Sequence, residues 1–133
     1  QARTPDMTQR AFCPREDAMP GDVAAADSPY VFHASKTPLR PLTPGVLGKE
    51  ARMPDGLVVR YQERQPGHDG DHWCEAGHTA YIVAGRIRYE FADAAVEAGP
   101  GDIVHIPAGH AHRHRPHVLG GEPVKYFVTE FFE

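Results

Sequence analysis

The chain has 133 residues, with 18 acidic and 14 basic side chains and a formal net charge of −4. A chain of this length forms one domain around a single hydrophobic core. Its mild acidity, without a basic stripe, excludes a nucleic-acid-binding surface, and the absence of about 18 consecutive apolar residues excludes a transmembrane helix. Two cysteines are too few for a disulfide scaffold, so a cytoplasmic location is the default expectation.

The first third of the chain is expected to be an extended, proline-rich arm. Seven of the thirteen prolines lie within the first 44 residues. Proline fixes φ and lacks an N–H donor, which disfavours helices and central strands. We therefore divide the chain into an arm over residues 1–50, which wraps the domain or a partner subunit, and a β-domain over residues 51–133. A lid is the alternative use of such an arm.

From residue 57 onward, the hydrophobic pattern changes to a period of two, which is typical of half-buried strands. Clusters of glycine, proline and aspartate mark the turns between the alternating segments. Strands are expected over residues 57–63, 78–84, 86–91, 95–97, 103–106, 110–114 and 124–132. Many short strands separated by turn signals predict an all-β sandwich or barrel.

Histidines gather in the β-domain, where eight of the nine fall between residues 68 and 117. Side chains alternate faces along a strand, so His72, Cys74 and His78 share one face if the segment is extended. His112 lies in a later strand segment. Imidazole and thiolate groups are good ligands for transition metals. The pattern predicts that His72, Cys74, His78 and His112 hold one divalent transition metal inside the barrel.

Each predicted ligand also has an ordinary structural alternative. For His112 it is a buried polar side chain with a hydrogen bond, and for Cys74 it is a small buried hydrophobe. For His72 it is a loop histidine beside Asp71, which is itself a weaker ligand candidate. His114 shares the face of His112 and is expected to orient a ligand or a substrate from behind the metal.

The segment from Gly101 to His112 resembles the second motif of the cupin superfamily. The matching pattern is Gly101-x5-Pro107-x-Gly109-x2-His112. The family motif ends in an asparagine, and this chain has Pro116 at that position. The resemblance covers residues 55–132.

The first cupin motif reads Gly, His-x-His, three or four residues, Glu, six residues, Gly. Gly85 matches the final glycine, and His78 stands at the glutamate position. A three-residue gap places His72 and Cys74 at the His-x-His pair. A four-residue gap instead places Asp71 and Trp73 there, and Trp73 cannot bind a metal.

The resemblance implies an all-β fold, a double-stranded β-helix or jelly-roll barrel, and often a homodimer. It also implies a metal and a small-molecule ligand or substrate inside the barrel, with no nucleic acid or membrane as partner. A histidine in place of the glutamate makes the ligand set softer. Iron, zinc, nickel or copper is therefore expected over manganese.

The favoured function is a metal-dependent enzyme acting on a small organic molecule. Iron would favour a dioxygenase, and zinc or nickel a lyase, isomerase or cyclase. No nucleophile elbow, phosphate-binding loop or dinucleotide fingerprint offers a competing chemistry. The alternatives are a non-catalytic cupin, used as a sensor or a storage protein, and a metal-free cupin scaffold.

Overall fold

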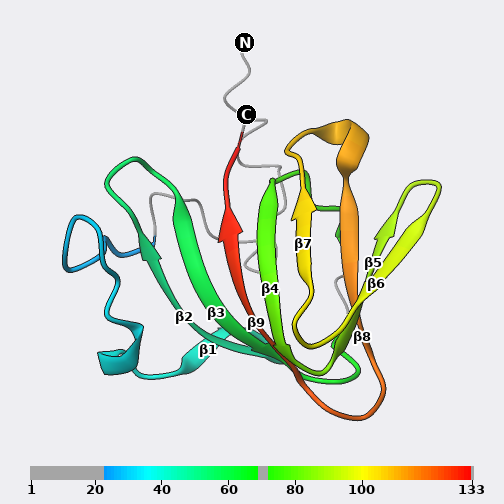
Figure 1. The fold of residues 1–133 in the computed structure, drawn as a ribbon, viewed down its shortest axis with the longest axis horizontal. Coiled ribbons are helices and arrows are strands. Elements are labelled where there is room, and N and C mark those ends of the chain that lie inside the picture. The colour runs from blue at the N-terminus through cyan, green and yellow to red at the C-terminus, as the bar shows by residue number, and fades with distance from the viewer. Residues whose placement is uncertain (1–22, 69–71, 133) are drawn as a thin grey trace.

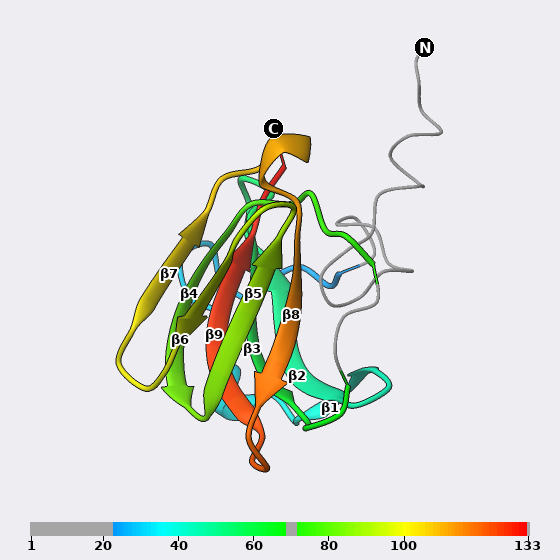
Figure 2. The same cartoon turned by 90° about the vertical axis from the view of Figure 1, so that its right-hand side faces the viewer.

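The computed structural model describes residues 23–68 and 72–132, and this part of the chain forms two facing antiparallel sheets (Figure 1). The larger sheet has the strand order β1-β2-β3-β9-β4-β7, and the smaller sheet has the order β6-β5-β8. Figure 2 shows the small sheet lying across one side of the large sheet. The predicted all-β jelly-roll barrel is confirmed.

The strands are β1 (Arg40–Thr43), β2 (Val46–Arg52), β3 (Val58–Arg64), β4 (His78–Ala84), β5 (Arg86–Phe91), β6 (Ala95–Ala98), β7 (Ile103–Ile106), β8 (His114–Leu119) and β9 (Val124–Glu130). The described residues also form two short 3-10 helices, η2 (Ala34–Lys36) and η3 (His110–His112). Within the described ranges, no helix is long and apolar enough to cross a membrane.

Most of the strand predictions hold, because the alternation of side chains was clear from residue 57 onward. Strands β4, β5 and β7 have the predicted bounds, and β6 ends one residue later than predicted. Strand β3 lies one residue further along the chain at both ends, and β9 ends two residues earlier than predicted. The strand predicted over residues 110–114 is wrong. That segment is the 3-10 helix η3, and strand β8 begins only at His114.

Part of the expected arm joins the barrel. Strand β1 and most of β2 lie between residues 40 and 50, and β2 pairs with β3 along its whole length. The proline-based prediction did not anticipate these two strands. Pro41, the one proline in these two strands, is tolerated because β1 is the edge strand of the large sheet. Residues 1–22 of the expected arm lie outside the described residues.

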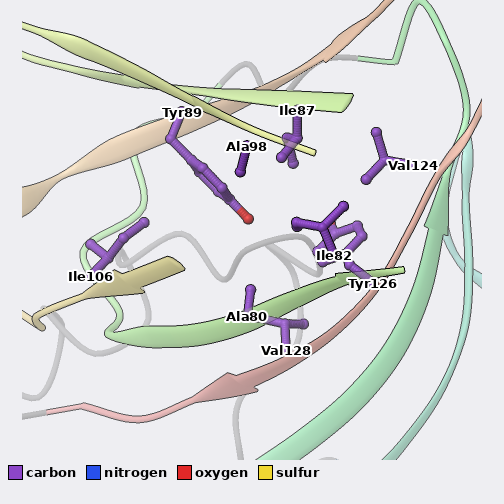
Figure 3. Packing of buried hydrophobic residues seen from close by; sticks show 9 residues of the cluster. All are labelled: Ala80, Ile82, Ile87, Tyr89, Ala98, Ile106, Val124, Tyr126 and Val128. Atoms are coloured by element: carbon purple, nitrogen blue, oxygen red, sulfur yellow. The ribbon is translucent and has the colours of Figure 1, made fainter. Parts of the chain in front are cut away.

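A compact apolar core fills the space between the two sheets (Figure 3). Its buried members come from β4, β5, β6, β7 and β9, and are Ala80, Ile82, Ile87, Tyr89, Ala98, Ile106, Val124, Tyr126 and Val128. Removing this apolar surface from water is the main force that holds the sheets together. The sharp hairpin between β4 and β5 turns on Gly85, whose φ of +81° is in the region that favours glycine.

Strand β3 departs from the apolar rule, because its inward-facing residues include Arg60, Gln62 and Arg64. Arg60 lies between two buried carboxylates. Its Nε donates to Glu50 over 2.9 Å, and its Nη1 donates to Glu130 over 2.7 Å. Burial works to lower the pKa of Arg60, but the two carboxylates outweigh burial and raise it. The barrel interior therefore has an apolar part and a charged part.

Candidate metal centre

Three potential ligands meet inside the barrel: Cys74, His78 and His114. Their ligand atoms all lie within 4.8 Å of one another. The three residues are 0%, 4% and 1% exposed, respectively. Buried imidazoles this close, without a carboxylate among them, are typical of a transition-metal site.

Backbone pairing fixes the positions of these side chains. Cys74 and His114 form an isolated antiparallel bridge, with N–H···O distances of 2.8 and 3.0 Å. Gly77 forms a second bridge with Phe131, which positions His78 as the first residue of β4. A side chain at Gly77 would collide with the Phe131 ring. Each ligand position is thus set by main-chain hydrogen bonds.

The hydrogen bonds of the two histidines determine their tautomers. The Nδ1 atom of His78 lies 2.9 Å from the Thr129 carbonyl oxygen, and Nδ1 of His114 lies 3.0 Å from the His112 carbonyl oxygen. A carbonyl only accepts, so each Nδ1 carries the proton and each Nε2 has a free lone pair. Backbone carbonyls orient metal-binding histidines in this way.

Both histidines are neutral at physiological pH. Burial lowers the pKa of His78 to about 4, against the opposing effect of its hydrogen bond to Thr129. Burial also lowers the pKa of His114 to about 4, with a further contribution from His78. Within the described part of the chain, the buried Nε2 of His114 has no hydrogen-bond partner. Two lone pairs therefore face a common point with no proton in the way.

The spacing of the cluster suits a tetrahedral ion. The Sγ atom of Cys74 lies 3.6 Å from Nε2 of His78. Zinc bonds of about 2.3 Å to sulfur and about 2.0–2.1 Å to nitrogen place two tetrahedral ligand atoms roughly 3.6 Å apart. The rings of His78 and His114 meet edge to face with centroids 5.0 Å apart. The residues present fit a metal of the zinc type.

The oxidation state of Cys74 decides how many ligands the cluster offers. Its sulfur is disulfide-bonded in this structure, and Cys13, the other cysteine of the sequence, lies outside the described residues. A disulfide sulfur has no proton to donate to His78 and is not a thiolate ligand. The oxidised form therefore offers two imidazoles, and the reduced form offers two imidazoles and a thiolate.

The structure brings together two of the four predicted ligands, Cys74 and His78, and places His72 and His112 at exposed positions. His112 ends the 3-10 helix η3, which follows the turn at Gly109. A 3-10 turn does not alternate faces, so the parity argument that paired residues 112 and 114 fails there. Asp71, the weaker candidate, lies outside the described residues.

His114 is the member of the cluster that sequence reasoning placed behind the metal rather than on it. The signal for its role was the run of histidines at residues 110, 112 and 114. Choosing among them required knowing where η3 ends and β8 begins. His112 takes part through its main chain, because its carbonyl oxygen orients His114.

A small cavity adjoins the two histidines. It is lined by Gln62, Arg64, His78, Tyr89, His114, Pro116, Tyr126 and Val128. The cavity is small, with about 20 Å³ of space for the centre of a water molecule. Pro116 lines it at the position where the cupin motif has asparagine. A metal held by His78 and His114 would lie at the wall of this cavity.

The two facing sheets, with buried histidines inside, define a jelly-roll barrel protein with a candidate metal site. The Cupin domain family matches residues 60–130, which is more than half of the chain. The chain therefore belongs to the cupin family. No curated protein matches it.

Solved structures share the fold at low sequence identity. KdgF from Halomonas sp. is 22% identical with a TM-score of 0.59, covering 74% of this chain and 92% of KdgF. The polyketide cyclase RemF from Streptomyces resistomycificus is 20% identical with a TM-score of 0.58, covering 76% and 78%. A single-site variant of oxalate decarboxylase from Bacillus subtilis is 21% identical with a TM-score of 0.59, covering 74% of this chain but 28% of the decarboxylase.

Proposed function

We propose that this cupin binds one divalent transition metal through Nε2 of His78 and of His114, joined by Cys74 when that residue is reduced. The observation that carries the proposal is the convergence of two buried Nε2 lone pairs, each fixed by an Nδ1 hydrogen bond to a carbonyl. An ion satisfies the lone pair of His114, whose buried Nε2 has no hydrogen-bond partner among the described residues, together with that of His78, whose Nε2 has only the Cys74 sulfur 3.6 Å away. The ligand types favour zinc, iron, nickel or copper over manganese.

The proposed activity is metal-dependent catalysis on a small organic molecule. Two or three protein ligands leave coordination positions open, as catalytic metal sites do. The metal, when bound, supplies Lewis-acid chemistry or, if it is iron, oxygen activation of the dioxygenase type. Lyase, isomerase and cyclase reactions need only the Lewis acid. RemF, a polyketide cyclase, and oxalate decarboxylase share this fold, which supports an enzymatic role for the present protein.

Tyr89 is the candidate hydrogen-bond donor to a substrate in the cavity. Its side chain reaches from β5 into the space between the sheets, with its hydroxyl oxygen pointing inward (Figure 3). Burial raises the pKa of Tyr89 far above its ordinary range, so the hydroxyl keeps its proton at neutral pH. A phenol that keeps its proton can donate a hydrogen bond to a bound substrate beside the metal site.

A non-catalytic binding protein is the second candidate, and the size of the cavity favours it. A cavity with only about 20 Å³ of space for the centre of a water molecule suits a metal with one small ligand, as in a sensor or a storage protein, better than it suits a large substrate. Turnover of any small organic acid or alcohol by the metal-loaded protein would show that it is an enzyme and would contradict the non-catalytic role.

Metal content is the first test, measured by mass spectrometry on protein purified without an affinity tag. We expect one ion per chain in the reduced wild type and less than a tenth of that in His114→Ala. The matched control is His112→Ala, which removes an exposed imidazole two residues away and should keep the ion. Loss of metal in His112→Ala but not in His114→Ala would show that His112, and not His114, is the ligand. A wild type without metal would leave the metal-free cupin scaffold as the remaining hypothesis.

A homodimer is proposed from the outer face of the large sheet. Ile103, Tyr81 and Phe127 are direct register partners across β7, β4 and β9, and they are 71%, 46% and 41% exposed. A continuous apolar row on a sheet marks an association surface. Sedimentation velocity of wild type and Tyr81→Glu tests it, with a dimer expected only for wild type. Arg88→Glu on the small sheet is the control, and a wild-type monomer at high concentration would contradict the proposal.

The compartment follows from the state of Cys74. Disulfides persist mainly in oxidising compartments, whereas the cytoplasm keeps thiols reduced. A cytoplasmic location therefore predicts a thiol at Cys74 and the three-ligand site. Alkylation of Cys74 in freshly lysed cells, read by mass spectrometry, distinguishes the two states.

A further inference from the structure

The cavity beside the histidines contains two hydrogen-bond donors with nothing to bind. Gln62 and Arg64 follow each other on the inward face of β3 and are 1% and 4% exposed. Among the described residues, Nε2 of Gln62 and Nε of Arg64 have no hydrogen-bond partner. A buried donor without an acceptor is costly and rare in native proteins. Both residues line the same cavity as His78 and His114.

The charge of this cavity is uncompensated in the part of the chain that the structure describes. Arg64 donates through Nη1 to the carbonyl oxygen of His68 over 2.8 Å, and no carboxylate pairs with its guanidinium there. The imidazoles of His78 and His114 are either neutral or positive, so they contribute no negative charge. A buried cation is costly unless an anion accompanies it. A divalent metal on the histidines would make the cavity more positive still.

The missing partner has a definite chemistry. It accepts hydrogen bonds from a guanidinium Nε–H and an amide N–H, and it carries negative charge. It is also small, because the cavity leaves only about 20 Å³ for the centre of a water molecule. A carboxylate has two acceptor oxygens and one negative charge, and it is the group that arginine binds most specifically. The tetrahedral phosphate group is larger and carries more charge than one arginine balances.

We propose that the cavity binds one carboxylate group of a small organic acid, whose oxygens accept from Nε2 of Gln62 and Nε of Arg64. The rest of the acid faces the hydroxyl of Tyr89 and the side chains of His78 and His114. This substrate class rests on the proposed function, since the acid lies beside the proposed metal. The carboxylate contacts themselves use only Gln62 and Arg64, so they can be tested without the metal.

The test is a titration of ¹⁵N-labelled protein with acetate, followed by the NMR signals of the Arg64 Nε–H and the Gln62 side-chain amide. It is run on metal-free protein and on zinc-loaded protein. We expect both signals to shift with acetate, and acetamide, the neutral analogue, to bind at least about tenfold more weakly. Arg64→Met and Gln62→Leu should each weaken acetate binding by about tenfold or more without changing the zinc content.

Arg88→Met is the matched control, because it removes an exposed arginine from the small sheet and should leave acetate binding unchanged. Gln62→Glu is the second variant. Residue 62 is the neighbour of Arg64 on the inward face of β3, so this variant places a carboxylate beside Arg64. The carboxylate should abolish acetate binding by repulsion. This variant keeps the size of the side chain, so it guards against a folding defect in Gln62→Leu.

The outcomes separate this inference from the proposed function. If zinc does not bind but acetate still shifts both signals, the metal proposal fails and the carboxylate site stands. If zinc binds and acetate shifts neither signal, the carboxylate site is overturned and the metal centre stands. Equal binding of acetamide, tighter binding of inorganic phosphate, or unchanged acetate affinity in both variants would also overturn it.

Discussion

Two arginines on the inward face of strand β3 have opposite surroundings. Arg60 is held between the carboxylates of Glu50 and Glu130, whereas Arg64 has one carbonyl and, among the described residues, an unpartnered Nε. They lie four residues apart, and both are nearly inaccessible to solvent. The first arrangement is complete within the protein, and the second becomes complete only with a ligand. Buried charge thus serves structure at one end of the strand and recognition at the other.

The largest expected effect comes from breaking the completed cluster. Arg60→Met leaves Glu50 and Glu130 buried without their cation, and loss of one partner of a buried ion pair costs about 3–5 kcal/mol of unfolding free energy. Arg64→Met should cost no more than about 1 kcal/mol, because it removes an uncompensated charge along with one hydrogen bond. Urea denaturation of both variants checks the contrast. Equal losses would mean that the two arginines have the same role.

The next effect is acid sensitivity of the metal-free protein. The pKa of His78 and His114 is about 4 in the folded state, against 6.5 for the ordinary group. The unfolded chain therefore binds more protons between these values, so stability is complete above pH 6.5 and is lost as the pH falls toward 4. The loss is on the order of 3 kcal/mol per histidine. In His114→Gln, denaturation between pH 7 and 4.5 should show a clearly shallower slope, and an unchanged slope would contradict the assignment.

Metal binding should stabilise the protein in a manner that depends on Cys74. Zinc at a hundred times its dissociation constant adds about 2.7 kcal/mol to the unfolding free energy. The thiolate joins the two imidazoles only after reduction, so zinc should bind more tightly with a reductant present. Calorimetric titration of the reduced and oxidised forms measures the difference. Cys74→Ser should bind zinc with the same affinity in both conditions, and a reductant effect in that variant would contradict this role.

The smallest effect is a gain in stability at the incomplete site. Gln62→Met replaces an amide whose Nε2 has no partner among the described residues by an apolar group of similar size. Relief of the unsatisfied donor should raise the unfolding free energy by about 1 kcal/mol. Thermal denaturation without added acids measures it, with the surface variant Arg88→Met expected to stay within about 0.5 kcal/mol of wild type. A destabilised Gln62→Met would show that the amide already has a structural partner.

The sequence by itself determined the barrel and part of the candidate site. Strands β4, β5 and β7 were predictable because each has a clear alternation between turn residues such as Gly85. Cys74 and His78 were predictable because their spacing places two metal-binding groups on one face of an extended chain. These are local properties, and local sequence carries them.

The tertiary structure decided the rest, because it depends on contacts between distant segments. His114, rather than His112, completes the cluster. The 3-10 helix η3 interrupts the alternation of side chains before His114, and the backbone of Cys74 pairs with that of His114. The sequence did not predict the charged interior of β3, because arginine is seldom fully buried. Only the position of β3 beside β2 and β9 shows that both point inward and that one has its carboxylates while the other lacks them.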